Sequence, residues 1–149
     1  RQYGFGNLYP KDPQKAAISD QWMTWSTDGF MGTFFPVFWQ LVRTEESQRD
    51  YNKIAEMAKQ SAEVLKVLEG HLDNNKFVAG DDFTYGDIPL GVLIHKYFVL
   101  DIKRPSMPGI EAWYQRLTER SPYKEHAMQP FGNSPEEFLK LQTKGEKNL

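Results

Sequence analysis

The 149 residues suffice for one domain with a buried core, and the formal net charge of −2 comes from 18 basic and 20 acidic residues. This nearly neutral net charge lacks the excess of basic residues that is typical of nucleic-acid-binding proteins. The absence of cysteine excludes disulfides, thiolate catalysis and cysteine-based zinc sites, and it fits the reducing cytoplasm.

The most apolar stretch, residues 29–42, does not qualify as a membrane span. It is shorter than the ~20 residues that a span needs, and Thr33, Pro36 and Gln40 interrupt it. No secretory signal is visible either. The sequence therefore predicts a soluble protein without a membrane partner.

A long first helix is predicted from residue 13 to about residue 43, bent at Pro36. Asp12 is a good N-cap, and Pro13 suits the first helical position, where its missing N–H costs nothing. Apolar residues at helical spacing form two stripes: Met23, Phe30, Phe34, Val37 and Leu41, and Trp22, Trp25, Gly29, Gly32, Pro36 and Trp39. A helix with two apolar sides is covered on both.

Two glycines interrupt the second of these stripes. Gly29 and Gly32 lie on one face between Trp25 and Trp39, where they cost helix stability. We expect something to approach this face closely. Tight helix packing or a dimer contact is favoured over a ligand pocket.

A second helix is predicted over residues 45–73. Its core face steps by threes and fours through Ile54, Ala58, Ser61, Leu65, Leu68 and Leu72. Charged residues cover much of the rest, so this helix lies at the surface with one side buried.

The stretch "FVAGDDFTYGDI" predicts a capping box before a third helix. With Thr84 as the N-cap, Asp87 is N3, and each side chain reaches the backbone N–H of the other residue. Phe83 and Ile88, at N′ and N4, form the matching hydrophobic staple. A role for Asp87 as general base or metal ligand is the alternative, which the capping pattern makes the weaker one.

The third helix, residues 85–100, is apolar nearly all round, which predicts a buried central helix with a local distortion at Pro89. Three further helices are predicted at residues 110–120, 121–128 and 134–141, the second with Ser121 as its cap, and the tail 142–149 is expected to fray. No strand signal of any length occurs. The fold class is therefore all-α, a bundle of about five to six helices.

Catalytic and metal-binding patterns are not found. His71, His95 and His126 are far apart in sequence, and His95 has the apolar neighbours of a hydrogen-bonded core histidine. No glycine-rich phosphate loop and no G-x-S-x-G motif occurs. We therefore assign no catalytic residue, no metal site and no cofactor to this chain.

Three segments in order resemble the C-terminal helical domain of cytosolic, bacterial-type glutathione transferases. They are "LYPKDPQKAAISDQWMTWSTD", "VLEGHLDNNKFVAGDDFTYGDIPLGVLIHKYF" and "RPSMPGIEAWYQRLTERSPYKEH". The middle segment carries the family's capping box and staple, and the resemblance covers residues 1 to about 130. The domain would then span residues 13–131, followed by a short helix and tail at 132–149.

The resemblance also implies what surrounds this domain in a longer protein. "RQYG" at the start would end the last helix of a thioredoxin-like domain, and residues 1–12 would be that end and the linker. The thioredoxin-like domain carries the glutathione site and the thiol-activating residue, so this chain alone is expected to be inactive. The parent would be a homodimer that conjugates glutathione, its co-substrate, to small apolar electrophiles.

The resemblance implies a substrate-binding role for Asp28, Met31 and Phe35, which share one face at i, i+3 and i+7. Bacterial relatives often carry Asn and Arg where Met31 and Phe35 stand here. The pocket would then prefer a more apolar substrate, or the catalytic role has been lost. The alternative function is a non-catalytic, transferase-like protein-interaction module.

Overall fold

The computed structural model describes residues 4–146, and every secondary-structure element with more than two residues in this range is a helix or a helical turn. In chain order they are α1 (Pro13–Trp25), the π-helical turn η1 (Ser26–Met31), α2 (Gly32–Val42), the 3-10 turn η2 (Glu46–Gln48), α3 (Tyr51–Leu72), α4 (Asp87–Val99), α5 (Pro108–Thr118), α6 (Ser121–His126) and α7 (Pro135–Glu146). Within residues 4–146 only two isolated β-bridges occur, and no strand. The all-α prediction is therefore confirmed.

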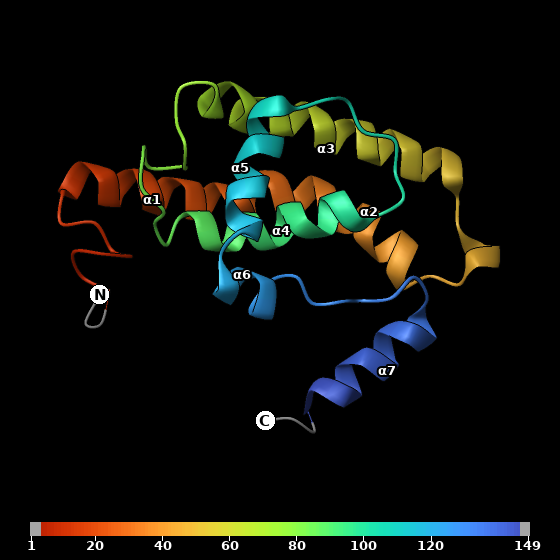
Figure 1. Cartoon of the computed structure of the whole chain (residues 1–149). Coiled ribbons are helices and arrows are strands. Elements are labelled where there is room, and N and C mark those ends of the chain that lie inside the picture. The colour runs from red at the N-terminus through yellow and green to blue at the C-terminus, as the bar shows by residue number, and fades with distance from the viewer. Residues whose placement is uncertain (1–3, 147–149) are drawn as a thin grey trace.

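The helices are arranged around the long rod formed by α1, η1 and α2 (Figure 1). Helix α3 runs antiparallel beside this rod (Figure 1). Helix α4 packs against the rod, and α5 packs against both α3 and α4. Helix α7 stands apart from the others at the C-terminal end of the chain (Figure 1).

The rod begins as the sequence predicts but contains a π turn that the spacing did not indicate. The Asp12 carboxylate accepts a hydrogen bond of 2.8 Å from the Gln14 N–H, with Pro13 as the first helical residue. In the π turn, the Ser26 hydroxyl donates to the Met23 carbonyl at 2.7 Å. Such hydroxyl back-bonding competes with the regular helical ladder, and π turns are often found at functional sites.

Helix α3 begins later than predicted, at Tyr51 instead of residue 45. Asp50 is the reason, because its carboxylate accepts from the Lys53 N–H at 3.0 Å and so caps the helix there. Residues 46–48 form only a 3-10 turn. The predicted core face is correct in full: Ile54, Ala58, Ser61, Leu65, Leu68 and Leu72 are all buried.

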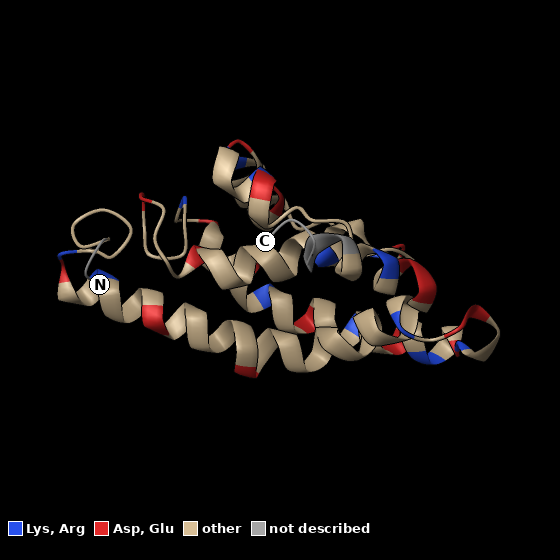
Figure 2. Cartoon of the chain, turned by 90° about the horizontal axis from the view of Figure 1, so that it is seen from below, with Lys and Arg blue, Asp and Glu red and all other residues tan. Residues whose placement is uncertain are grey.

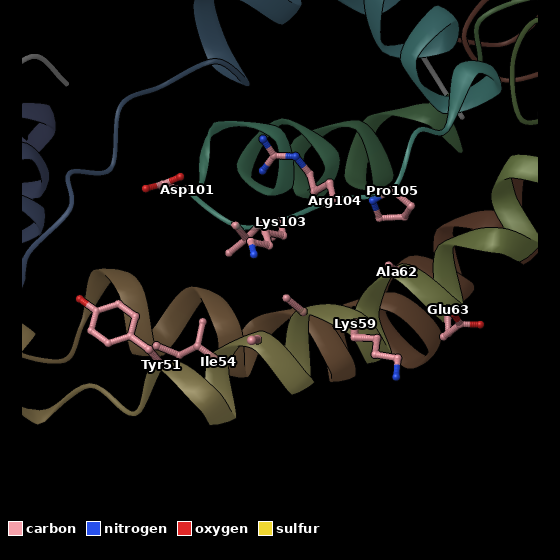
Figure 3. Close-up of a pocket in the computed structure, with 12 residues that line it drawn as sticks. Tyr51, Ile54, Lys59, Ala62, Glu63, Asp101, Lys103, Arg104 and Pro105 are labelled. Atoms are coloured by element: carbon pink, nitrogen blue, oxygen red, sulfur yellow. The ribbon is translucent and has the colours of Figure 1, made fainter.

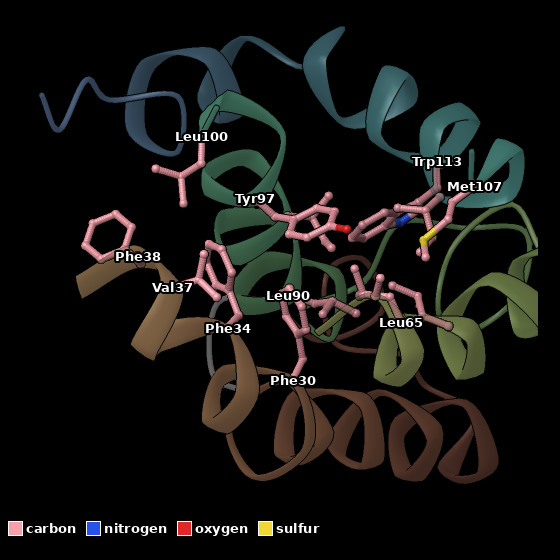
Figure 4. Close-up of a cluster of buried hydrophobic side chains, with 14 of the residues drawn as sticks. Phe30, Phe34, Val37, Phe38, Leu65, Leu90, Tyr97, Leu100, Met107 and Trp113 are labelled. Atoms are coloured by element: carbon pink, nitrogen blue, oxygen red, sulfur yellow. The ribbon is translucent and has the colours of Figure 1, made fainter. Parts of the chain in front are cut away.

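Helix α4 supplies the centre of the core. Figure 4 shows side chains from several helices pointing into a common interior, among them Phe30, Phe34, Leu65, Leu90, Tyr97 and Trp113. The helix is nevertheless not buried all round, since Ile88 and Val99 are exposed. His95 is buried, and its Nδ1 lies 2.9 Å from the Tyr114 hydroxyl, as expected for a hydrogen-bonded core histidine.

The last three helices differ in detail from their predicted bounds. Helix α5 begins at Pro108, where the Glu69 carboxylate accepts from the N–H groups of Gly109 and Ile110 at 2.9 and 2.8 Å. Ser121 is the first residue of α6, not its cap, and the cap position is Arg120. Helix α7 continues through residues 142–146, which the sequence assigned to a frayed tail. Residues 147–149 of that tail, and residues 1–3 of "RQYG", lie outside the described residues.

Charged residues of both signs are distributed around the bundle (Figure 2). The rod is the exception, because Lys15, Asp20 and Asp28 are its only charged residues over positions 13–42. It also exposes large apolar side chains: Met23, Met31, Phe35 and Trp39. The rod therefore presents an apolar face to the outside of this chain.

Candidate binding site at an aromatic hollow

The three residues predicted to line a pocket all lie at the surface of the rod. Met31 is 36% exposed and Phe35 is 46% exposed, and Asp28 is also exposed. The step from Asp28 to Met31 falls inside the π turn, which holds one residue more than an α turn. The assumed α-helical spacing therefore applies from Met31 to Phe35 but not from Asp28 to Met31.

Phe35 borders a hollow of about 500 Å³ between α2, α4 and the C-terminal segment, which we call the aromatic hollow. Its lining residues are Phe35, Phe38, Arg43, Val92, Lys96, His126, Ala127, Gln129, Pro130, Phe131, Phe138, Leu141 and Gln142. Phe38 joins the aromatic part of this lining, with ring centroids 6.1 Å from Phe35 and 5.1 Å from Phe131. Neither Asp28 nor Met31 belongs to this lining.

Helix α7 closes one side of the aromatic hollow, and two arginines contact the segment that contains it. The guanidinium carbon of Arg43 lies 3.9 Å from the centroid of the Phe138 ring, a cation–π distance. Arg49 donates to the Asn133 carbonyl at 2.8 Å. Gly132 has a φ of +73°, so the chain turns toward α7 through a conformation that suits glycine.

Among the described side chains, Lys96 contributes the only amine to the lining of the aromatic hollow. Its Nζ lies 5.5 Å from the centroid of the Phe38 ring. Burial lowers the pKa of the Lys96 ammonium, because a half-buried charge loses part of its hydration. The lining is thus aromatic and aliphatic with a few polar groups, the usual make-up of a small-molecule site.

Asp87 lies outside the aromatic hollow, at the centre of a group of hydrogen bonds that holds separate segments of the fold together. Its Oδ2 accepts from the Thr84 N–H at 2.8 Å, the reciprocal half of the capping box. Its Oδ1 accepts from the Val78 N–H at 3.0 Å and from the Trp113 Nε1–H at 2.9 Å. Burial raises the pKa of Asp87, although these hydrogen bonds to the carboxylate act in the opposite direction.

The rest of the capping box differs from its sequence pattern. The Thr84 hydroxyl lies 3.1 Å from Ser19 Oγ and 3.2 Å from Asp87 Oδ2, while the Asp87 N–H donates to the Thr84 carbonyl. Ile88 is 42% exposed. Phe83 packs edge-on against Phe77 and lies under the Arg120 guanidinium, 3.8 Å from its ring centroid. Phe83 thus packs against residues distant in sequence, Phe77 and Arg120.

A second hollow, of about 610 Å³, lies between α3 and residues 101–105 (Figure 3). Small residues of α3 form its floor, and Lys59, Glu63, Asp101, Lys103 and Arg104 stand around it. It therefore has charges of both signs and lacks the aromatic lining of the first hollow. We regard the aromatic hollow as the candidate site.

No group of three or more His, Asp or Glu side chains suited to a metal ion is found among residues 4–146. Over the same part of the chain, no helix combines the length and apolar character needed to cross a bilayer.

The sequence pattern located only one residue of the aromatic hollow, Phe35. Phe38, Lys96, Phe131 and Phe138 were missed as site residues, because they come from four separate segments. Phe38 and Lys96 had a detectable signal, since each lies three or four residues from an apolar neighbour on a helix face. The position of Phe138 depends on where α7 docks, for which no local signal exists.

Comparisons with known proteins agree with this fold. Residues 30–121 match the family described as the C-terminal domain of glutathione S-transferase. The glutathione S-transferase GstB of Escherichia coli K12 is 30% identical over 129 residues, which are 87% of this chain and 62% of that protein. The sequence match therefore spans less than two thirds of the length of this relative.

Two solved structures are similar in three dimensions. The theta class glutathione S-transferase from Xanthomonas axonopodis pv. citri, determined with glutathione bound, superposes with a TM-score of 0.80 and 40% identity, covering 84% of this chain and 66% of that one. A Bombyx mori glutathione transferase superposes with a TM-score of 0.66 and 29% identity, covering 81% and 55%.

Proposed function

We propose, from the premise that this chain belongs to the glutathione S-transferase C-terminal domain family, that its aromatic hollow holds the electrophile in a glutathione transferase. The observation that carries the proposal is the aromatic hollow itself. Rings from α2, α7 and the segment after α6 converge there, and α4 completes the lining. Small apolar molecules bind in such concave, largely apolar sites.

The chemistry assigned to this chain is binding and orientation. Holding an electrophile beside a thiolate turns a bimolecular encounter into a reaction within one complex. Residues 4–146 contain no thiol and no thioredoxin-like sheet. A thioredoxin-like part of the whole protein would therefore hold glutathione and supply the residue that activates its thiol. Residues 1–12 would link that part to the helical domain at residues 13–131, and residues 132–149 would form the C-terminal extension of the helical domain.

The apolar face of the rod supports this arrangement. Met31, Phe35 and Trp39 are exposed one turn apart, and exposed apolar surface of this kind marks interaction sites. The thioredoxin-like part would cover the end near Met31 and Phe35, and a second copy in a homodimer is the further partner that we propose. Asp28 and Met31 would then meet the substrate only in the whole protein. A transferase of this kind acts in the cytoplasm.

The proposal is tested by measuring the Kd of the 149-residue chain for 2,4-dinitrotoluene, an unreactive analogue of aromatic electrophiles. Nitroaromatics quench tryptophan fluorescence, and the Trp39 ring lies 5.9 Å from the Phe35 ring. Truncating Phe35 to Ala removes an aromatic contact and should raise the Kd about fivefold.

The control is Met23→Ala, which truncates another exposed apolar residue of the rod, outside the aromatic hollow. It should change the Kd less than about twofold, within the usual scatter of surface substitutions. Equal Kd values for Phe35→Ala and the unchanged chain would show that the dinitrotoluene binds elsewhere.

A further inference from the structure

The charges around the aromatic hollow have one sign. Among the described side chains, Arg43, Lys96 and His126 are the ionisable residues of its lining, which includes no described Asp or Glu. Glu125, whose carboxylate lies 3.9 Å from the His126 ring, does not line the hollow. An aromatic site bordered only by basic groups has a positive potential inside it.

Lys96 has no protein counter-ion in the part of the chain that the structure describes. Neither an ion pair within 4.0 Å nor a hydrogen bond within 3.5 Å involves its ammonium among the side chains that the structure describes, those of residues 4–143. Its charge faces the Phe38 ring instead, at 5.5 Å. A half-buried ammonium without an acidic partner has lost hydration free energy that no ion pair offsets. A bound anion could therefore pair with the Lys96 ammonium without displacing a protein carboxylate.

The end of α4 does not explain why Lys96 is placed there. Basic residues near a helix C-terminus often bond the last carbonyl groups. At this end of α4, Arg104 from the loop that follows the helix does so, since its Nη1 donates to the carbonyls of Tyr97 and Leu100 at 3.0 and 2.6 Å. The Lys96 ammonium is therefore left for the hollow.

Arg43 and His126 contribute less to binding an anion. The Arg43 guanidinium lies between the rings of Trp39 and Phe138, at 5.2 and 3.9 Å from their centroids, so its position serves to hold α7. His126 is exposed at the edge and has Glu125 beside it. Lys96 is thus the group best placed to select a charge inside the hollow.

We infer that Lys96 makes the aromatic hollow selective for apolar molecules that carry an acidic group, with an aromatic carboxylate as the simplest example. The inference rests on the proposed function and narrows its substrate class from apolar electrophiles in general to those with a carboxylate or sulfonate. The rings of Phe35, Phe38 and Phe131 would hold the apolar part, and Lys96 would pair with the acid.

The experiment compares two probes of the same shape, 2-naphthoate and its uncharged amide, 2-naphthamide. Calorimetric titration of the 149-residue chain gives a Kd for each at neutral pH. Naphthoate should bind about tenfold more tightly than naphthamide, as expected for a charge-assisted contact in a partly desolvated site. Lys96→Met, which keeps the length and apolar stem of the side chain, should abolish this difference, and Lys96→Arg should retain it.

The matched control is Lys59→Met, which makes the same change at the second hollow (Figure 3). It should leave both Kd values within about twofold, because surface charges far from a site are screened. Melting temperatures of all variants show whether they fold. Lys96→Met removes an unpaired half-buried charge, so it should fold at least as stably as the unchanged chain.

The outcomes separate this inference from the proposed function. If naphthamide binds as well as naphthoate, or if Lys96→Met keeps the preference for naphthoate, the charge selectivity is wrong and the electrophile site is unaffected. If Lys59→Met removes the preference, the anion binds at the second hollow and the assignment to Lys96 is wrong. If neither probe binds the unchanged chain, both the selectivity and the proposed function fail.

Discussion

Replacing Asp87 by Ala removes the acceptor on which three separate segments converge. The Asp87 carboxylate accepts from the N–H groups of Val78 and Thr84 and from the Trp113 indole, and all three residues are at most 2% exposed. In the Ala variant these donors lose their partner in a place that water reaches only if the structure opens. The change therefore affects the turn before α4, the start of α4 and the packing of α5 together.

The expected loss in the free energy of unfolding follows from the number of buried N–H donors that are left without an acceptor. A buried donor without a partner costs about 1 to 3 kcal/mol, so three of them give roughly 3 to 9 kcal/mol. Removing a buried carboxylate recovers part of this, because burial already raises the pKa of Asp87 and so opposes its ionised form. We expect a net loss of about 3 to 5 kcal/mol, a large share of the ~5–15 kcal/mol that stabilises an ordinary domain.

The assay is urea unfolding of the 149-residue chain, followed by circular dichroism and tryptophan fluorescence. The free energy of unfolding of Asp87→Asn should lie between those of Asp87→Ala and the unchanged chain. An amide offers one acceptor oxygen and turns its N–H₂ group toward the other donors. Asp82→Ala is the control, because the Asp82 side chain is exposed and its ion pair with Lys15 is long, 3.7 Å. A loss below about 1 kcal/mol for Asp87→Ala would refute the assignment of Asp87 as a buried structural acceptor.

Three further outcomes are expected. Tyr97→Phe should stabilise the chain by about 1 kcal/mol in the same assay, because the buried Tyr97 hydroxyl has no hydrogen-bond partner among the described residues; destabilisation would reveal one. Burial lowers the pKa of His95, so the folded state favours the neutral ring, and the melting temperature should fall as pH drops below about 6.5. The melting temperature of His95→Gln should fall less over the same pH range, and an equal dependence on pH in both chains would contradict this. The chain alone should not accelerate the reaction of glutathione with 1-chloro-2,4-dinitrobenzene, since residues 4–146 contain no thioredoxin-like sheet; a rate above the uncatalysed one, proportional to chain concentration, would contradict it.

Features governed by a few neighbouring residues could be predicted from the sequence. The start of α1 at Asp12 and Pro13, the buried face of α3 and the contact from Asp87 back to Thr84 all lie within one or two helical turns. The burial of His95 followed from its apolar neighbours alone. Helical periodicity and capping are local, so a single sequence contains enough information to place them.

The aromatic hollow could not be predicted in this way, because only tertiary structure brings its lining together. Phe35 and Phe138 lie about a hundred positions apart, and their proximity depends on how Arg43 and Arg49 hold the segment that leads into α7. The π turn that offsets Asp28 from Met31 was equally invisible to a pattern that assumes 3.6 residues per turn. Periodicity indicates which side of a helix is apolar. Which apolar residues are covered, and which are left to line a hollow beside an unpaired lysine, is decided by the packing of helices distant in sequence.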